Sequence, residues 1–193
     1  SIVRAMKRES LLAEKFVKCV ENERGELQNI SFENADKYNL AFDTVDEIAK
    51  AYPDKMAMLH IAEDGTERRF TFKDMKRASN QCANYFKSLG IKKGDRVMLI
   101  LKRHYQFWFA MLGRHKLGAV AIPATNQLLE KDFTYRFEAG QVKAILCTAD
   151  GDTARQAELA EQVCGIQLTK ILVGGKREGW HDFNEEYSLF SRR

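Results

Sequence analysis

The feature that most constrains the fold is an alternation of short apolar segments with helical patterns between residues 96 and 173. Parallel strands need a long crossover between them, and a helix usually supplies it. The alternation therefore predicts an α/β fold, with a mostly parallel sheet and helices on both faces. The predicted strands are 96–101, 119–122, 142–147 and 170–173, and the predicted helices between them are 105–117, 130–138 and 153–164.

A hairpin and a long helix are predicted before this region. The pair Asp64-Gly65 separates two strand-like runs within residues 55–72, which is typical of a β-hairpin. Thr71 can then cap a helix that ends at Gly90. The side chains expected on its buried face are Met75, Ala78, Cys82, Phe86 and Leu89.

The two ends of the chain are expected to differ from this middle part. Apolar residues at helical spacing over 2–20 predict an amphipathic helical arm, so that residues 1–37 form an arm and linker and 38–193 form the α/β part. Thr44 and Glu47 form a capping-box pattern for a helix that Pro53 ends. The tail after residue 173 loses the periodic pattern, so no further strand or helix is expected there. Because the pattern stops without a closing element, we expect the chain to be a segment of a longer protein.

Composition excludes several classes of function. The formal net charge is only +4, with basic and acidic residues interleaved, so no nucleic-acid partner is expected. No apolar run approaches the ~20 residues of a membrane span, and no signal peptide is evident. The four cysteines, Cys19, Cys82, Cys147 and Cys164, lie far apart in the sequence. The last three fall among apolar residues and fit small buried hydrophobes in a reducing compartment, and a cytoplasmic protein is expected.

The sequence contains no complete catalytic set. Arg177 follows Gly175-Lys176 where a P-loop requires Ser or Thr, and no G-x-G-x-x-G or G-x-S-x-G motif is present. The histidines and cysteines do not show metal-ligand spacing. We therefore predict no catalytic residue and no metal ligand in this chain.

One basic corner is a candidate binding site. Lys102, Arg103 and His104 follow directly after a predicted strand, at the sheet edge where doubly wound folds bind ligands. They could contact phosphate or form a solvated turn. The aromatic helix that follows is expected to be buried on more than one side, and Gly118 and Pro123 are expected to turn the chain into the next strand.

Three segments in order carry a family resemblance. Residues 71–75, 89–97 and 116–123 match the T/S-[YF]-x-[ED]-[LM] start, the "LGV-x-x-GDRV" turn and the "K-[AL]-G-A-V-x-x-P" helix end of the adenylate-forming acyl-CoA synthetases. The resemblance covers roughly 38–190 and is greatest to the acetyl and medium-chain branch. It implies that the chain is an incomplete N-terminal part of such an enzyme's AMP-binding domain.

The resemblance also implies a chemistry for the parent protein. Such enzymes join a small carboxylate to AMP with Mg²⁺ and ATP, and then transfer the acyl group to CoA. The family's phosphate loop, its later AMP and Mg²⁺ motifs and its C-terminal lysine are not in this sequence, so the chain alone is expected to be inactive and to hold no cofactor tightly. An isolated piece is also expected to associate with itself through exposed apolar surface.

Within this piece the resemblance singles out one residue. Arg103 matches the basic residue of the branch's "L-P-R-x-P-E-W" stretch, although its neighbours differ, and the resemblance implies that it contacts a phosphate of CoA. Two alternatives remain open. The chain could be a non-catalytic doubly wound domain that binds a ligand or partner, or part of an adenylation domain that serves a carrier protein. The identity of the acyl chain does not follow from these residues.

Overall fold

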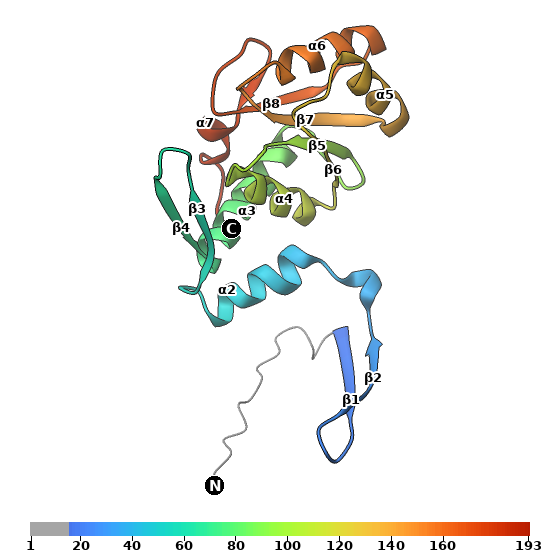
Figure 1. Cartoon of the computed structure of the whole chain (residues 1–193), viewed down its shortest axis with the longest axis vertical. Helices are drawn as coiled ribbons and strands as arrows, with labels where there is room; N and C mark the ends of the chain where they lie inside the picture. Colours follow the sequence, from blue (N-terminus) through green and yellow to red (C-terminus); the bar gives the residue numbers. More distant parts are fainter. Residues whose placement is uncertain (1–15) are drawn as a thin grey trace.

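The computed structural model describes residues 16–193, and its centre is a five-stranded parallel sheet (Figure 1). Its strands lie in the order β6-β5-β7-β8-β9, and every neighbouring pair is parallel. They are β5 (Arg96–Ile100), β6 (Val120–Pro123), β7 (Val142–Thr148), β8 (Thr169–Val173) and β9 (His181–Asp182). The predicted α/β class is confirmed, and the four predicted strands all belong to this one sheet.

Helices cover both faces of the sheet. Along β5, Val97 and Leu99 belong to one core cluster, whereas Met98 and Ile100 belong to the other, because successive strand residues point to opposite faces. The first cluster is covered by α3 (Phe72–Ser88), α4 (Gln106–Leu117) and α7 (Phe183–Tyr187). The second is covered by α5 (Glu130–Gly140) and α6 (Thr153–Cys164).

The start of α3 is built as its sequence predicts. The Thr71 hydroxyl accepts a hydrogen bond from the Asp74 N–H at 3.2 Å, and the Asp74 carboxylate accepts one from the Thr71 N–H at 2.9 Å. This capping box satisfies backbone groups that a helix start would otherwise leave unpaired. The predicted inner face of α3 is buried, except that Leu89 is half-buried, and Gly90 follows the helix with a φ of 82°.

Helices α3 and α4 approach each other closely at Gly113. A Cβ atom at that position would lie 2.5 Å from the Cβ of Cys82, so only glycine allows this packing. Gly118 ends α4 with a φ of 74°, as expected of a helix C-terminal glycine. Helix α4 is buried on more than one side, as predicted, because Gly113 packs against α3 while Phe109 contacts Phe70 and Tyr187, and Trp108 is its exposed aromatic residue.

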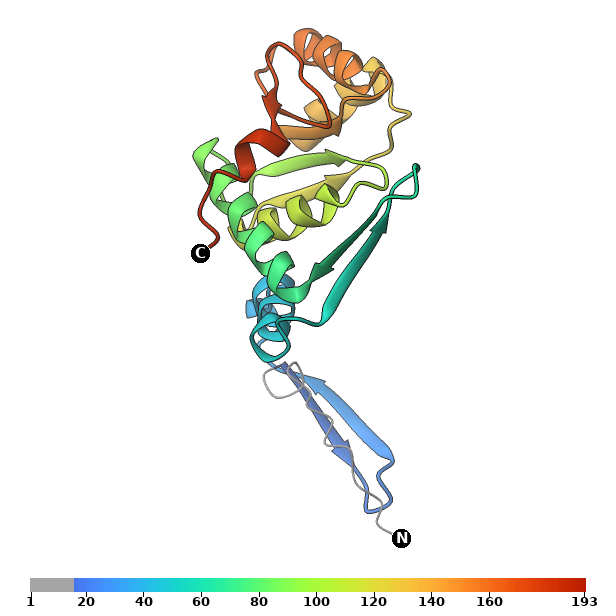
Figure 2. The ribbon, with the colours of Figure 1, turned by 90° about the vertical axis from the view of Figure 1, so that its left-hand side faces the viewer.

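The N-terminal part corrects the predicted helical arm. Residues from Val17 form a hairpin of β1 (Val17–Glu21) and β2 (Leu27–Phe32), which projects from the rest of the molecule (Figures 1 and 2). The Asn22 side chain accepts hydrogen bonds from the N–H groups of Arg24 and Glu26, and these bonds favour a turn over a helix. The rest of the predicted arm lies outside the described residues.

The next helical segment begins earlier than predicted. It comprises η1 (Ala35–Lys37), the π-helical η2 (Leu40–Asp46) and α2 (Glu47–Ala51). Asn39, not Thr44, provides the cap, because its side chain accepts from the N–H groups of Ala41 and Phe42 at 3.0 and 3.2 Å. Thr44 instead shares a 2.6 Å hydrogen bond with the Tyr38 hydroxyl. The helix ends before Pro53, as expected.

The second hairpin is confirmed and lies beside the sheet domain. It pairs β3 (Met56–Ile61) with β4 (Glu67–Thr71) around the predicted turn. Phe70 packs against Tyr105 and Phe109 with ring centroids 5.2 and 5.3 Å apart, so this hairpin is anchored to the start of α4.

The C-terminal tail corrects a further expectation. It adds β9 to the sheet and then α7, whose start is capped by the Asp182 side chain accepting from the Glu185 N–H at 3.2 Å. Both elements are too short for a periodic pattern to reveal them. Among residues 16–193, no helix has the length and apolar content that crossing a membrane would need.

Candidate functional site

The candidate site is a crevice at the carboxyl edge of the parallel sheet. After β5 the chain passes to β6 on one side, and it returns to β7 on the other side of β5. Helix α4 then lies on one face and α6 on the other, so the loops after β5 and β7 diverge. This reversal of strand order opens a crevice at the position where doubly wound folds bind ligands.

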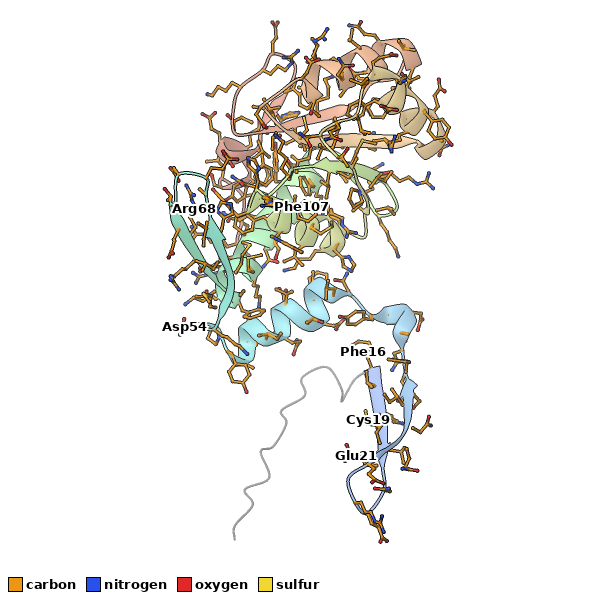
Figure 3. The ribbon with its side chains drawn as sticks, viewed as in Figure 1. Phe16, Cys19, Glu21, Asp54, Arg68 and Phe107 are labelled. Carbon is orange, nitrogen blue, oxygen red and sulfur yellow. The ribbon has the colours of Figure 1, made fainter. Side chains whose placement is uncertain are left out.

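A cavity of about 1200 Å³ occupies this crevice. One wall is the loop 102–105 after β5, and another is the loop after β7 around Asp150. The tip of the β3–β4 hairpin closes a third side, where Figure 3 labels Arg68. Helix α7 contributes Asn184. The site therefore combines elements from four parts of the sequence.

Lys102 and Asp150 join the two diverging loops. The Lys102 ammonium donates to the Asp150 carboxylate across the crevice, and this contact lowers the pKa of Asp150 below its ordinary value. The nearby Thr148 hydroxyl acts in the same direction, although its geometry is not that of a hydrogen bond. Lys102 has a φ of 40°, a left-handed conformation that is strained for a residue with a side chain. The ion pair neutralises the Lys102 charge.

Arg103 lies at the rim of the same cavity. Its backbone carbonyl accepts a hydrogen bond from His60 Nε2 at 3.1 Å, which ties the loop to β3. Its guanidinium is exposed and has neither an ion pair nor a hydrogen bond with any residue in the described part of the chain. The structure thus leaves Arg103 as an uncompensated cation at the ligand-binding edge of the sheet.

Tyr105 and Gln106 form the inner wall of the crevice. The Tyr105 ring contacts the His60 ring at a centroid distance of 5.3 Å, and the Arg68 guanidinium lies 5.4 Å from its centroid. Gln106 is 5% exposed, and its Nε2 donates to Asn184 Oδ1 at 3.2 Å, which links α4 to α7. These contacts hold Tyr105 against the β3–β4 hairpin and Gln106 against α7.

Cys147, near the carboxyl end of β7, does not present a reactive thiolate. Burial raises the pKa of Cys147 to about 12, so this thiol at the end of β7 stays protonated near neutral pH. Among residues 16–193, no group of three or more His, Cys, Asp or Glu side chains is arranged to hold a metal ion. Arg68, Lys102 and Arg103 line the cavity, but so do Glu63, Asp64 and Asp150, so the feature that favours an anionic ligand is the guanidinium of Arg103 at the rim.

Sequence reasoning located one part of this site and missed the rest. Arg103 lies where the strand pattern placed it, after β5 and at the rim of the cavity. His60, Gln106 and Asp150 were missed, since each belongs to a different element. One sequence signal pointed to these residues, namely Gln106, a polar residue at the start of an aromatic helix.

Comparison with known proteins bears on the whole α/β part. Residues 45–187 match the family model described as "AMP-binding enzyme". A mouse protein named mitochondrial acyl-coenzyme A synthetase ACSM5 is 33% identical over 155 residues, which cover 77% of this chain and 26% of that protein. Acetyl-coenzyme A synthetase of Bacillus subtilis is 29% identical over 147 residues, covering 74% of this chain and 24% of that protein. The chain thus spans about a quarter of these relatives.

Solved structures show the same fold. An acyl-CoA synthetase of Brucella canis superposes with a TM-score of 0.66 at 25% identity, covering 81% of this chain and 28% of that one. The anthranilate CoA ligase AuaEII, solved in complex with anthranoyl-AMP, gives a TM-score of 0.66 at 22% identity over 81% of this chain and 29% of that one. The described part of the chain therefore has the architecture of a segment of these enzymes.

Proposed function

The chain belongs to the family of AMP-binding enzymes, and we propose on this basis that it is the N-terminal segment of an ATP-dependent carboxylate–CoA ligase. The names of the relatives support this proposal, since they are acyl-CoA and acetyl-CoA synthetases. The proposed reaction has two steps. A carboxylate attacks ATP to give an acyl-adenylate and pyrophosphate, and the CoA thiol then displaces AMP to give the thioester.

The described residues contribute to binding in this proposal and not to the bond-making steps. ATP would enter as its magnesium complex, but no described cluster of acidic side chains suits that ion, so we assign no residue of this chain to it. We further propose that the 193-residue chain alone carries out neither half-reaction. Exchange of labelled pyrophosphate into ATP by the purified chain, above that of a mock preparation, would contradict this.

We propose that Arg103 contacts a phosphate of CoA. The observation that carries this assignment is the guanidinium without a partner at the crevice rim, next to a lysine that Asp150 already neutralises. A guanidinium binds phosphate through charge-assisted hydrogen bonds, each worth about 1.5–3 kcal/mol. The location at the carboxyl edge of the sheet supports the same assignment.

Isothermal titration of CoA into the chain tests this role. Arg103→Ala should raise the Kd for CoA about tenfold, equivalent to about 1.4 kcal/mol, and Arg103→Lys should recover part of the loss. Arg96→Ala is the matched control, because Arg96 is an exposed arginine at the opposite end of the same strand. A Kd for Arg103→Ala that equals that of the control would remove Arg103 from the CoA site.

The complete ligase allows a second measurement. There, Arg103→Ala should raise the KM for CoA by about tenfold or more and leave adenylate formation within about twofold of wild type, since CoA enters only in the second half-reaction. Equal losses in both half-reactions would show that Arg103 serves ATP or the fold instead.

A further inference from the structure

A second cavity, of about 500 Å³, is lined by arginine side chains. It lies between the β3–β4 hairpin, α3, α4 and the end of the chain, and it shares Arg68 and Tyr105 with the crevice, whereas its other lining residues are different. The arginines are Arg68 and Arg69 from β4, Arg77 from α3, and Arg192 near the end of the chain. The cavity thus gathers positive charges from three separate parts of the sequence.

Three of these four charges have no counter-ion. Arg69 forms an ion pair with Glu67 at 3.2 Å. Arg68, Arg77 and Arg192 are exposed and form no ion pair with any residue from 16 to 193. Like charges around one cavity add up to a positive potential, and such a potential attracts anions.

The other walls do not cancel this potential. The acidic residue among them is Asp74, whose carboxylate already accepts hydrogen bonds from the N–H and the hydroxyl of Thr71, both at 2.9 Å. Phe70, Phe109 and Tyr187 supply apolar surface. A charge interacts more strongly beside apolar walls than in open water, because the dielectric constant there is lower.

Arg192 is held at the cavity by side-chain amides of α3, beside which the chain ends (Figure 2). Asn80 Nδ2 donates to the Arg192 carbonyl at 2.9 Å, and Asn84 Nδ2 donates to the carbonyls on either side of it, at 3.0 and 3.1 Å. The buried Gln81, which lines the cavity, donates to two carbonyls earlier in the same segment. These bonds fix the backbone from which the Arg192 guanidinium extends.

Phosphate fits this arrangement better than a carboxylate does. A carboxylate offers one charge and two oxygens, whereas a phosphate group carries about −1.5 to −2 charges near pH 7 and at least three acceptor oxygens. A phosphate group can therefore accept charge-assisted hydrogen bonds from guanidinium groups that belong to three different elements.

We propose that this second cavity binds a phosphate dianion, either inorganic phosphate or the phosphate group of a small monoester. Arg68, Arg77 and Arg192 donate hydrogen bonds to its oxygens. Asn84 is a positioning residue, because it does not line the cavity and acts through the backbone of Arg192. The site is independent of the proposed CoA contact, since Arg103 lines the other cavity.

Isothermal titration of inorganic phosphate into the chain tests the site. Wild type should bind with a Kd of about 1 mM or lower, and Arg77→Ala and Arg192→Ala should each raise this Kd about tenfold. Arg77→Lys should recover part of the loss, because it keeps the charge but not the planar fork. Arg96→Ala is the matched control, since Arg96 is exposed and does not line the cavity. It should bind phosphate as wild type does.

A double-mutant cycle tests the positioning role of Asn84. Asn84→Ala should raise the phosphate Kd about three- to tenfold in the wild-type chain and leave it unchanged in the Arg192→Ala chain. A loss of the same size in both backgrounds would show that Asn84 does not act through Arg192.

Phenyl phosphate distinguishes the two sources of the phosphate group. A Kd at least about threefold below that of inorganic phosphate would assign the site to an ester whose body packs on the aromatic wall, and equal values would assign it to free phosphate. AMP should bind no more tightly than inorganic phosphate. A Kd for AMP more than about tenfold lower, and raised by Arg77→Ala, would make the cavity part of a nucleotide site and overturn the inference.

Failure here can be told apart from failure of the CoA assignment. Arg77→Ala should leave the Kd for CoA within about twofold of wild type, and Arg103→Ala should do the same for phosphate. Loss of phosphate binding in Arg103→Ala but not in Arg77→Ala would place the phosphate at the crevice rim, and the inference would be wrong. It would be equally wrong if wild type showed no saturable phosphate binding at about 10 mM.

Discussion

The two β-hairpins of this chain have the same plan but different surroundings. In the β3–β4 hairpin, Met58 and Phe70 pack against the core, and His60 is hydrogen-bonded to the loop that carries Arg103. In the β1–β2 hairpin every strand residue except Val17 is exposed. The comparison teaches that pairing alone does not bury a hairpin. A second surface must lie within reach, and for β3–β4 that surface is α4.

The exposed hairpin is nevertheless amphipathic. The register pairs Val17 with Phe32 and Cys19 with Ile30, so these residues share one face of the ribbon. Lys18 lies on the other face and forms an ion pair with Glu33. Since an isolated two-stranded ribbon is marginally stable in water, we expect the first hairpin to open independently of the body, whereas the second should open only when the body unfolds.

Thiol labelling should show the largest contrast. Cys19 lies on the projecting hairpin (Figure 3), whereas Cys82 is fully buried in α3, the helix that follows β4. Burial raises the pKa of Cys82 well above its ordinary value and that of Cys147 to about 12. At about pH 8, roughly one Cys147 thiol in ten thousand would be ionised, so Cys19 should react at least about a thousandfold faster than either.

Ellman's reagent followed by peptide mass spectrometry measures these rates. All four cysteines should react together in denaturant, which controls for reagent access. Raising the pH should speed the reaction of Cys147 in the folded chain about tenfold per pH unit, because the ionised fraction of a thiol rises tenfold per unit below its pKa, here about 12. Native labelling of Cys82 as fast as that of Cys19 would show that the body opens as readily as the hairpin.

Matched phenylalanine variants should differ less, but clearly. Phe70→Ala removes ring contacts with Tyr105 and Phe109 and should lower the free energy of unfolding by about 2–3 kcal/mol, somewhat below the cost for a fully buried ring. Phe32 is 73% exposed, so Phe32→Ala should change this free energy by no more than about 0.5 kcal/mol. Urea denaturation measures both. Comparable losses would mean that the first hairpin is packed in solution.

The turn glycines provide the smallest and sharpest comparison. Gly25 and Gly65 have φ values of 75° and 82°, and neither has an atom within 4 Å of where a Cβ would lie. Alanine at either position meets the same backbone strain of about 1–2 kcal/mol. Gly65→Ala should lower the free energy of global unfolding by about 1 kcal/mol, whereas Gly25→Ala should leave it unchanged.

Hydrogen exchange separates the two glycine effects. Gly25→Ala should accelerate exchange in β1 and β2 alone, because the strain is released when that hairpin opens. Gly65→Ala should accelerate exchange in the slowest amides of the sheet as well. An equal effect of the two variants on global stability would mean that both hairpins unfold together with the body.

Local sequence patterns were sufficient for four of the five strands of the sheet and for the ends of α3 and α4. Apolar runs such as the one in β7 can be buried on both faces only as central parallel strands, which made their role predictable. The Thr71 capping box and Gly118 act within a few residues of themselves, so their signal is local. The failures lie where the local signal was weak or ambiguous. Residues 17–32 carry apolar side chains that suit either a helix or a hairpin, and β9 and α7 are too short for periodicity.

The sequence by itself determined that this chain forms a parallel α/β sheet and that a basic residue, Arg103, follows one of its strands. Only the tertiary structure decided what surrounds that residue. His60 and Asp150 lie 43 and 48 positions away from their partners in the Arg103 loop, and Asn184 lies 78 positions from Gln106. Contacts between residues so far apart leave no periodic trace, because they are set by the order in which the strands pack. The crevice is thus a property of the reversed strand order, which no single segment of the sequence encodes.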